Sequence, residues 1–597
     1  MVLHYVELAT SRGVMPNEHS PTRTAVPEEV QTADLRGLIP YLIIALAALA
    51  IRLAKLSLWP LLPAEAETAF SAWRAVGSRG GATGDYVPLL YLFDLIVAGL
   101  FRAGDGSIRL LSALAGAGLV LVPWFLRERL GRQGSLAASI MLALSPTMVH
   151  ASRTADGAIL AALSVAVCLT ALDRYLRDSI TGSLSWVGVW LVLGLMSGPA
   201  LLTPVIVALL MFLWWRLRRM ASDDKPSAVR EALQAVAGEF RERSTYLPAI
   251  VVLLVVGTAA LSNLGGLGAT IELQWRWFAD LAPKASGLPW YHLLRNLGIY
   301  EYLIVALALV GLISGLLRKE RLVGGLGTWL LTCLVLSSLL GHRDPYWVLD
   351  ALLPALALAA RGVQWLWDEL VVDVDWRDAA GLWLALCLGW FALFSLAAWT
   401  HSGQERFLTQ SRIGLGVLIL AWAGYWYWAQ RRAALRLLSA LLLILMLIGT
   451  ARTTTAIAYQ TGRDPREPLL VRPTSNEVSE LAAFVSDYSS RTAGDPHQLT
   501  VAYEQDLDPL IGWYLRDMER LERVGNVLLR PTQAALVARS RADESYPAGY
   551  AGQRFRLVER WPEQNLSTRE RLRWFMFRDA VGWIEPETVR VWVRLDY

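Results

Sequence analysis

Apolar runs long enough for helices that enter a membrane alternate with short charged loops over most of the chain. A membrane-spanning helix needs about 20 mainly apolar residues, whereas a strand of a membrane barrel alternates in character over about ten. The pattern therefore predicts an all-α polytopic membrane bundle of about thirteen spans. We expect these spans near residues 37–53, 109–126, 135–150, 157–176, 184–199, 200–215, 247–263, 297–317, 322–341, 346–366, 380–400, 411–430 and 434–451.

The run from Val87 to Phe101 is also apolar, but the charges of the following loops argue against a full crossing. Cytoplasmic loops of membrane proteins are enriched in Lys and Arg. If residues 87–101 form a surface or re-entrant helix and the N-terminus is cytoplasmic, the basic loops fall inside, and only the acidic loop 368–378 departs from the rule. We therefore predict a multi-pass protein of the cell membrane, with its first loop and its C-terminus outside. The basic loops are 127–132, 173–177, 215–220, 318–321 and 430–436.

Polar sequence flanks the predicted bundle at both ends. Residues 1–36 are expected to be a disordered cytoplasmic tail, residues 37–451 the transmembrane domain with a first outer loop at 55–108, and residues 452–597 an extracytoplasmic α/β domain. In this last domain, periodicity and turn signals predict an alternation of helices and strands. The expected helices are 479–488, 508–520 and 531–540, and the expected strands are 499–505, 524–530 and 587–597.

Composition narrows the class of protein further. Hydrophobic residues make up 54% of the 597 residues and charged residues only 18%, which excludes a large soluble protein. A net charge of +4 gives no general affinity for nucleic acid, and the three cysteines all lie in apolar runs, which offers no disulfide framework. The chain has no P-loop, dinucleotide-binding glycine pattern, HExxH or GxSxG, so ATP-driven transport and metalloprotease chemistry lose their usual support.

Acidic residues in two outer loops are the candidates for catalysis. Glu65 and Glu67 follow the first span, and a carboxylate beside a membrane-surface cavity can act as a general base; the alternative is a solvated loop acid. Residues two apart lie on different faces of a helix, so only one of the pair is expected to point into a site. Asp156 is a candidate second acid or metal ligand, or the N-cap of the helix that follows. A divalent metal would suit the chemistry, but no outer-loop acid cluster has convincing ligand spacing.

Basic residues near the same surface are candidates for phosphate binding. Arg153 can hold a phosphate bidentately, and adjacent His342 and Arg343 form a second candidate anion site. The alternative for all three is a cluster of charges at the level of the lipid headgroups. Arg52 ends the first span, where it either snorkels or faces the site.

Several segments, taken in order, resemble the N-terminal module of the GT-C membrane glycosyltransferases. They are IRLAKL at the end of the first span, PAEAETAF, GDYVPLLYLFDLIVAGLF and the segment that runs from SIRLLSALAG to SPTMVHASR. The resemblance implies a multi-span bundle that takes a sugar from a polyprenyl-phosphate carrier at the outer face. It matches the first-loop acid of the family to Glu65, the arginine that ends the first span to Arg52, and a Ser-Arg pair to Ser152 and Arg153.

The chain departs from the family pattern at several places. Ala64 precedes Glu65 where relatives carry Asp-Glu, Tyr86 stands near the usual His or His-Pro, and Asp156 meets the later acid only approximately. These departures leave two hypotheses open.

The first hypothesis is a membrane glycosyltransferase that uses a polyprenyl-phosphate sugar donor and an extracytoplasmic lipid, glycan or protein acceptor. Glu65 is then the base, Asp156 a second catalytic acid, and the phosphate is held by Arg153, His342 and Arg343, with Arg52, Glu67 and Tyr86 also in the substrate site. The second hypothesis is a catalytically degenerate subunit of a membrane complex, which binds a protein partner through the C-terminal domain. A flippase is a third interpretation. An open groove at the acids favours the enzyme, and a filled groove favours the subunit.

Overall fold

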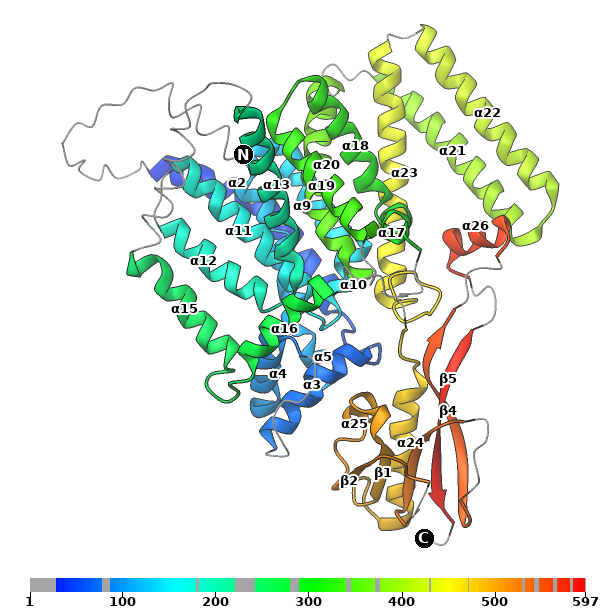
Figure 1. Cartoon of the computed structure of the whole chain (residues 1–597). Helices are drawn as coiled ribbons and strands as arrows, with labels where there is room; N and C mark the ends of the chain where they lie inside the picture. The colour runs from blue at the N-terminus through cyan, green and yellow to red at the C-terminus, as the bar shows by residue number, and fades with distance from the viewer. Residues whose placement is uncertain are drawn as a thin grey trace.

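The computed structural model describes residues 28–77, 86–101, 103–178, 182–220, 242–279, 289–339, 345–370, 376–428, 431–470, 472–528, 532–541, 547–561, 566–579 and 584–595. Residues 28–459 form a helical domain, and residues 477–594 form a smaller α/β domain beyond one end of it (Figure 1). The first described helix begins at Glu28, so part of the expected N-terminal tail is helical. Residues 1–27 lie outside the described chain.

The helical domain contains long apolar helices. Eight of its described segments are long and apolar enough to cross a membrane, and up to ten are if each of two bent pairs counts as one span. The helices are α2 (Glu28–Leu53), α3 (Pro63–Val76), α4 (Pro88–Leu100), α5 (Asp105–Ile108), α6 (Leu110–Leu119), α7 (Val122–Phe125), α8 (Arg127–Leu130), α9 (Arg132–Leu144), α10 (Pro146–Ser152), α11 (Ala158–Asp178), α12 (Gly182–Leu195), α13 (Leu202–Met220), α15 (Arg243–Gly257), α16 (Gly266–Ala279), α17 (His292–Tyr300), α18 (Tyr302–Leu317), α19 (Arg321–Leu339), α20 (Val348–Leu370), α21 (Trp376–Ser402), α22 (Glu405–Trp428) and α23 (Arg431–Tyr459). Short 3₁₀ turns lie at Pro199–Leu201 and Pro345–Trp347.

Every segment that the apolar pattern marked as a span falls on a helix, but not every one is a straight, full-length span. The pairs α9 with α10 and α17 with α18 bend by 57° and 101°. The first bend coincides with Pro146, which cannot continue the hydrogen bonding of the preceding helix. Three others match helices that are shorter than a full span, at Leu184–Leu195, Pro199–Met211 and Arg243–Gly257.

Helix α4 is the run that the charge pattern marked as an incomplete crossing. It has 13 residues, which correspond to about 20 Å at 1.5 Å per residue, against about 30 Å for the hydrocarbon core. Its length therefore agrees with a partial crossing, and the side of the membrane on which it lies stays a prediction.

Close packing in the bundle depends on small residues where helices cross. Gly311 on α18 faces Gly362 on α20, and a Cβ at Gly311 would lie 1.9 Å from the carbonyl oxygen of Leu358. A larger side chain at that position would force the helices apart, as is general for small residues at membrane helix interfaces.

Within the described residues, the C-terminal domain has a five-stranded mixed sheet and three α-helices. The strand order is β2-β1-β3-β5-β4, with β1 parallel to both β2 and β3, and β5 antiparallel to β3 and β4. The elements are α24 (Glu477–Ala493), β1 (Thr500–Glu504), α25 (Leu510–Tyr514), β2 (Arg520–Val524), β3 (Ala535–Arg539), β4 (Tyr550–Arg560), α26 (Thr568–Phe577) and β5 (Glu585–Arg594).

The predicted α/β class of this domain is confirmed, but two of its elements were predicted wrongly. Residues 531–540, expected to be a helix, contain strand β3. The strand expected at 524–530 lies earlier in the chain, as β2, which ends at Val524. The sequence ALVAR suits a helix by propensity, but β3 is buried between β1 and β5, and tertiary pairing overrides that preference. Strand β4 and helix α26 were not expected.

The C-terminal domain packs directly on the helices of the first loop. Phe70 of α3 lies in the same buried cluster as Ile511 and Trp513 of α25. The indole Nε1 of Trp513 and the hydroxyl of Tyr514 donate to the two carboxylate oxygens of Asp105, at 2.9 and 2.8 Å. The first loop and the C-terminal domain therefore share one core, which fixes their relative position.

Candidate active site

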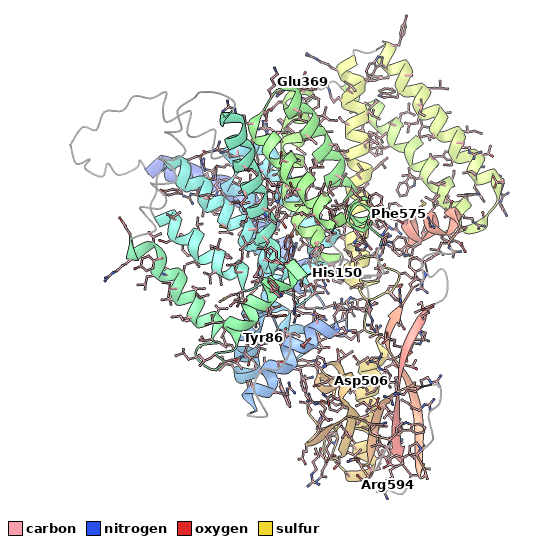
Figure 2. The ribbon with its side chains drawn as sticks, viewed as in Figure 1. Tyr86, His150, Glu369, Asp506, Phe575 and Arg594 are labelled. Atoms are coloured by element: carbon pink, nitrogen blue, oxygen red, sulfur yellow. The ribbon has the colours of Figure 1, made fainter. Side chains whose placement is uncertain are left out.

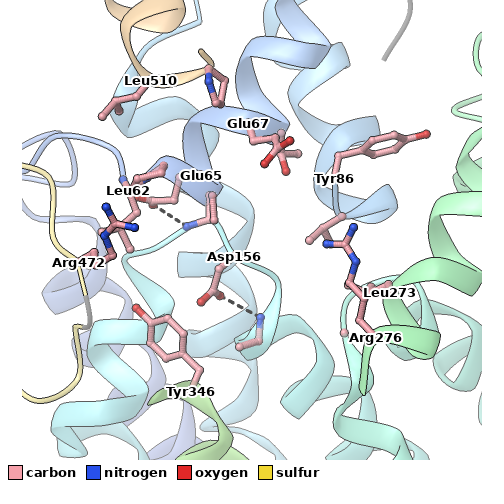
Figure 3. A pocket seen from close by; sticks show the side chains of 18 of the residues that line it. Leu62, Glu65, Glu67, Tyr86, Asp156, Leu273, Arg276, Tyr346, Arg472 and Leu510 are labelled. Carbon is pink, nitrogen blue, oxygen red and sulfur yellow. Dashed lines mark hydrogen bonds between the residues drawn. The ribbon is translucent and has the colours of Figure 1, made fainter. Parts of the chain in front are cut away.

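A cavity of about 840 Å³ lies where the first loop, the helical domain and the C-terminal domain meet (Figure 3). Figure 2 shows Tyr86, at the start of α4, on the helical side of this junction and Asp506 on the C-terminal domain. The lining combines apolar side chains with several carboxylates and three arginines. Its main segments are 62–68, 86–87, 155–161, 197–200, 269–277, 346–350, 469–472, 506–510, 539, 557–558 and 587.

Glu65 lies in the wall of the cavity at the start of α3. Pro63 occupies the first position of this helix, and the Glu65 side chain accepts a 2.7 Å hydrogen bond from the backbone N–H of Leu62, as in half of a capping box. Arg109 donates from Nε and Nη2 to the two oxygens, each at 2.8 Å, in a bidentate pair. Arg463 adds a bond of 2.9 Å, and the N–H of Ala155 one of 2.8 Å.

Five N–H groups therefore point at the Glu65 carboxylate, whose side chain is completely buried. Burial alone would raise the pKa of Glu65, but the positive charges of Arg109 and Arg463 outweigh it and lower the pKa to about 2. A carboxylate has about four lone-pair sites, and here all are taken by donors from the protein. The base function expected of Glu65 conflicts with this geometry, because its oxygens already serve to join three parts of the chain.

Glu67 is the second acid of the first loop, and it points into the cavity, with Arg276 on the other side of the open space (Figure 3). It is half-buried. Burial raises the pKa of Glu67, the charge of Arg276 lowers it, and the charge of Asp508 raises it further, with a net upward shift. Both glutamates line the cavity, but Glu65 is completely buried among its donors whereas Glu67 is half-buried, so the expectation that only one would point into a site stays a prediction.

Asp156 also lines the cavity, beside Tyr346 (Figure 3). Its Oδ1 accepts a 3.0 Å hydrogen bond from the backbone N–H of Ala158, the first residue of α11. This is the N-capping geometry that was weighed as the alternative for Asp156, and it coexists with a place in the cavity wall.

Tyr86 lines the cavity as well, and its hydroxyl accepts a 2.8 Å hydrogen bond from Nδ2 of Asn263.

Arg52 and Arg153 were expected to contact substrate, but neither is among the described cavity-lining residues. Arg52 is buried and donates to Ser152 Oγ and to the carbonyl of Leu142, at 3.1 and 3.0 Å. Arg153 donates to four carbonyl groups at the end of α2, at 2.7 to 3.1 Å, and lies over the ring of Tyr459. Both guanidinium groups hold the C-terminal end of α2 in place.

His342 and Arg343 lie outside the described residues. Among the residues that are described, no group of three His, Cys, Asp or Glu side chains is placed to hold a metal ion.

Arg276 on α16 was missed by the sequence analysis, although a pattern in the sequence marks it. Positions 269, 272, 273 and 276 share one helix face and line the cavity. The opposite face carries the largely exposed side chains of Ile271, Trp275 and Phe278. Helix α16 is therefore amphipathic, and its arginine lies between an apolar surface and the cavity.

Comparisons with known proteins support a single fold. A family model described as dolichyl-phosphate-mannose-protein mannosyltransferase matches residues 85–237. The crystal structure of ArnT from Cupriavidus metallidurans bound to undecaprenyl phosphate aligns with a TM-score of 0.50, at 14% identity, over 86% of this chain and 94% of that one. The chain has a GT-C fold. The apo oligosaccharyltransferase of Archaeoglobus fulgidus aligns with a TM-score of 0.48, at 12% identity, over 83% of this chain and 65% of that one. No curated protein sequence matches the chain.

The GT-C fold confirms the resemblance found in the sequence and the predicted architecture, a multi-pass helical bundle with a small C-terminal sheet. In this GT-C protein, the cavity lies between the bundle and the C-terminal domain, with the first-loop acids in its wall.

Proposed function

We propose that this protein is an integral membrane glycosyltransferase that moves a sugar from a polyprenyl-phosphate-linked donor to an extracytoplasmic lipid, glycan or protein acceptor. The GT-C fold supports the reaction class. The ArnT structure of the same fold was solved with undecaprenyl phosphate bound, which supports a polyprenyl-phosphate donor here. The predicted topology, with a cytoplasmic N-terminus, opens the cavity to the outer side of the cell membrane.

The observation that carries the proposal is the position of Arg276. The exposed apolar face of α16 suits contact with lipid tails, while the opposite face turns the Arg276 guanidinium into the cavity. A polyprenyl phosphate whose chain lies in the membrane would bring its phosphate to such a boundary. A guanidinium group matches a phosphate bidentately and remains charged at all physiological pH values.

Arg276 already pairs with Glu272 on its own helix, at 3.3 Å, and this pair is exposed. An exposed pair one helical turn apart contributes only about 0.3–0.5 kcal/mol, so exchange of this one pair for a phosphate costs little. Arg276 also interacts electrostatically with Glu67. The other two arginines of the cavity, Arg472 and Arg539, both pair with Glu587 of the C-terminal domain.

The test is retention of undecaprenyl phosphate by the purified full-length protein in lipid nanodiscs, followed by native mass spectrometry. Wild type should retain the lipid, and Arg276→Ala should weaken binding by about tenfold, the effect of losing about 1.4 kcal/mol. Arg491→Ala is the matched control, because Arg491 is exposed on α24 and pairs only with its neighbour Asp487 among the described residues. Binding that is equal in wild type and Arg276→Ala would remove Arg276 from the site.

A second candidate is a catalytically degenerate GT-C protein that serves as a binding or assembly subunit. Ala64 favours it, because this residue lines the cavity at the position where the resembling family carries the first acid of an Asp-Glu pair. The open cavity favours the enzyme instead, since neither Tyr86 nor another side chain of the described residues fills it. A wild-type protein that binds no undecaprenyl phosphate but co-purifies with a stoichiometric membrane partner would support the subunit.

A further inference from the structure

We propose that Glu67, and not Glu65, is the general base that activates the acceptor. This assignment rests on the proposed glycosyl transfer and names the residue that removes the proton of the acceptor.

The two glutamates differ in what surrounds their oxygens. Those of Glu65 accept from five N–H groups at 2.7 to 2.9 Å, two of them on the bidentate Arg109. If Glu65 took a proton, the buried guanidinium groups of Arg109 and Arg463 would lose their negatively charged partner. Breaking a buried pair in this way is strongly unfavourable, because it leaves uncompensated charge in a buried place.

The geometry of α3 places the Glu67 carboxylate on a different side of the helix from that of Glu65. Two residues along a helix correspond to a rotation of about 200°, so a helix that buries Glu65 against Arg109 presents Glu67 on its opposite side. Both glutamates line the cavity, but it is the half-buried Glu67 side chain that lies across the open space from Arg276 (Figure 3). A base on one wall and a phosphate-binding arginine on the other leave room for the reacting sugar between them.

The surroundings of Glu67 shift its pKa upward. Arg276 approaches from α16, and Asp508 approaches from the C-terminal domain, where it is held by Arg523 at 3.0 Å and by Arg74 of α3 at 3.9 Å. Desolvation and the charge of Asp508 raise the pKa of Glu67, and this makes its carboxylate a stronger proton acceptor. The C-terminal domain thereby contributes to the chemistry of an acid that belongs to the first loop.

The proposed step is a single displacement in which atoms and charges balance. The acceptor O–H or N–H gives its proton to Glu67 while the acceptor atom forms a bond to the anomeric carbon of the sugar. The bond from that carbon to the phosphate oxygen breaks, and the electron pair leaves with the polyprenyl phosphate, whose added negative charge Arg276 offsets. A single displacement of this kind inverts the configuration at the anomeric carbon.

The test compares Glu67 variants of the full-length protein in nanodiscs with a polyprenyl-phosphate sugar donor. Glu67→Gln should lower kcat by about 10²–10⁴-fold, the usual contribution of a general base, with an unchanged melting temperature. Wild-type activity should fall as pH drops through the pKa of Glu67, and this acid limb should be missing from the residual activity of Glu67→Gln. Formate should restore part of the activity of Glu67→Ala, which a purely structural role would not allow. Glu480→Gln, at an exposed position of α24, is the matched control and should behave as wild type.

Two results would overturn the assignment. The first is a Glu67→Gln protein with wild-type kcat and a wild-type pH profile. The second is an inactive Glu67→Gln protein combined with a Glu67→Ala protein that formate does not rescue. If the wild type itself transfers no sugar from any polyprenyl-phosphate donor, the proposed function fails first, and the two failures are thereby distinguished.

Discussion

Arg463, in the connector that follows the last membrane helix, donates a 2.9 Å hydrogen bond from Nη2 to Oε2 of Glu65, in the helix that follows the first. Its Nε also donates to the carbonyl of Pro60, at 3.1 Å. Residues 398 positions apart are joined in this way, and Arg109 binds the same carboxylate from a third segment. Glu65 is thus the junction that holds the first loop, and Glu67 with it, against the rest of the molecule.

Replacement of Glu65 by Gln should destabilise the folded protein. The change leaves two buried guanidinium groups without their carboxylate, and this should lower the free energy of unfolding by about 3–5 kcal/mol. Thermal unfolding in detergent, followed by tryptophan fluorescence, should show a lower melting temperature for Glu65→Gln than for Glu67→Gln. Equal melting temperatures for the two variants would show that Glu65 has no structural role.

Replacement of Arg463 by Ala should loosen the first loop while the bundle stays folded. Glu65 keeps its bidentate bond to Arg109, so the ion pair survives in part. Hydrogen exchange of the amides at residues 60–70 should increase, whereas amides of α18 and α20 should not change. Protection at 60–70 that equals wild type would mean that the connector does not restrain the loop.

Acid should weaken the protein in a defined pH window. The pKa of Glu65 is depressed from 4.5 to about 2 in the folded state, so the unfolded chain binds more protons between these values. The contribution of ionised Glu65 to the free energy of unfolding is therefore fully present above about pH 4.5 and is lost as pH falls toward 2. The melting temperature of wild type should drop more steeply over this window than that of Glu65→Gln, and parallel curves would contradict the assigned ion pairs.

Arg153 and Arg276 should respond to substitution in opposite ways. Arg153→Ala removes hydrogen bonds to the end of α2 and should lower stability by about 1.5–3 kcal/mol, with little effect on the affinity for undecaprenyl phosphate. Arg276→Ala should weaken lipid binding and leave the melting temperature unchanged. Tight lipid binding that depends on Arg153 would show that this arginine holds the phosphate, as the sequence analysis expected.

The sequence was sufficient to predict the fold class, because apolar run length and loop charge report directly on membrane helices. It singled out Glu65 as the base, but it could not show what surrounds this carboxylate, because the partners of Glu65 lie 44 and 398 residues away, at Arg109 and Arg463. Such partners are recognised only when the chain is folded.

Two other differences between expectation and structure have separate causes. Arg52 and Arg153 carry charges that suit a phosphate, but the helix end beside them offers carbonyl oxygens, and these take up the guanidinium groups. Arg276 lies between the spans expected at 247–263 and 297–317, where no helix was predicted. The apolar and polar positions of this segment nevertheless repeat with the period of a surface helix.

The central claim is tested most directly by turnover. Purified wild-type protein in nanodiscs would be incubated with polyprenyl-phosphate-linked sugars and with acceptor material extracted from the membranes of the source cells, and release of free polyprenyl phosphate would be followed by mass spectrometry. The account predicts release that depends on the protein and on the acceptor fraction, and that is lost in Arg276→Ala and Glu67→Gln. Release that is no faster with wild type than without protein, from a preparation that is folded and binds undecaprenyl phosphate, would contradict it.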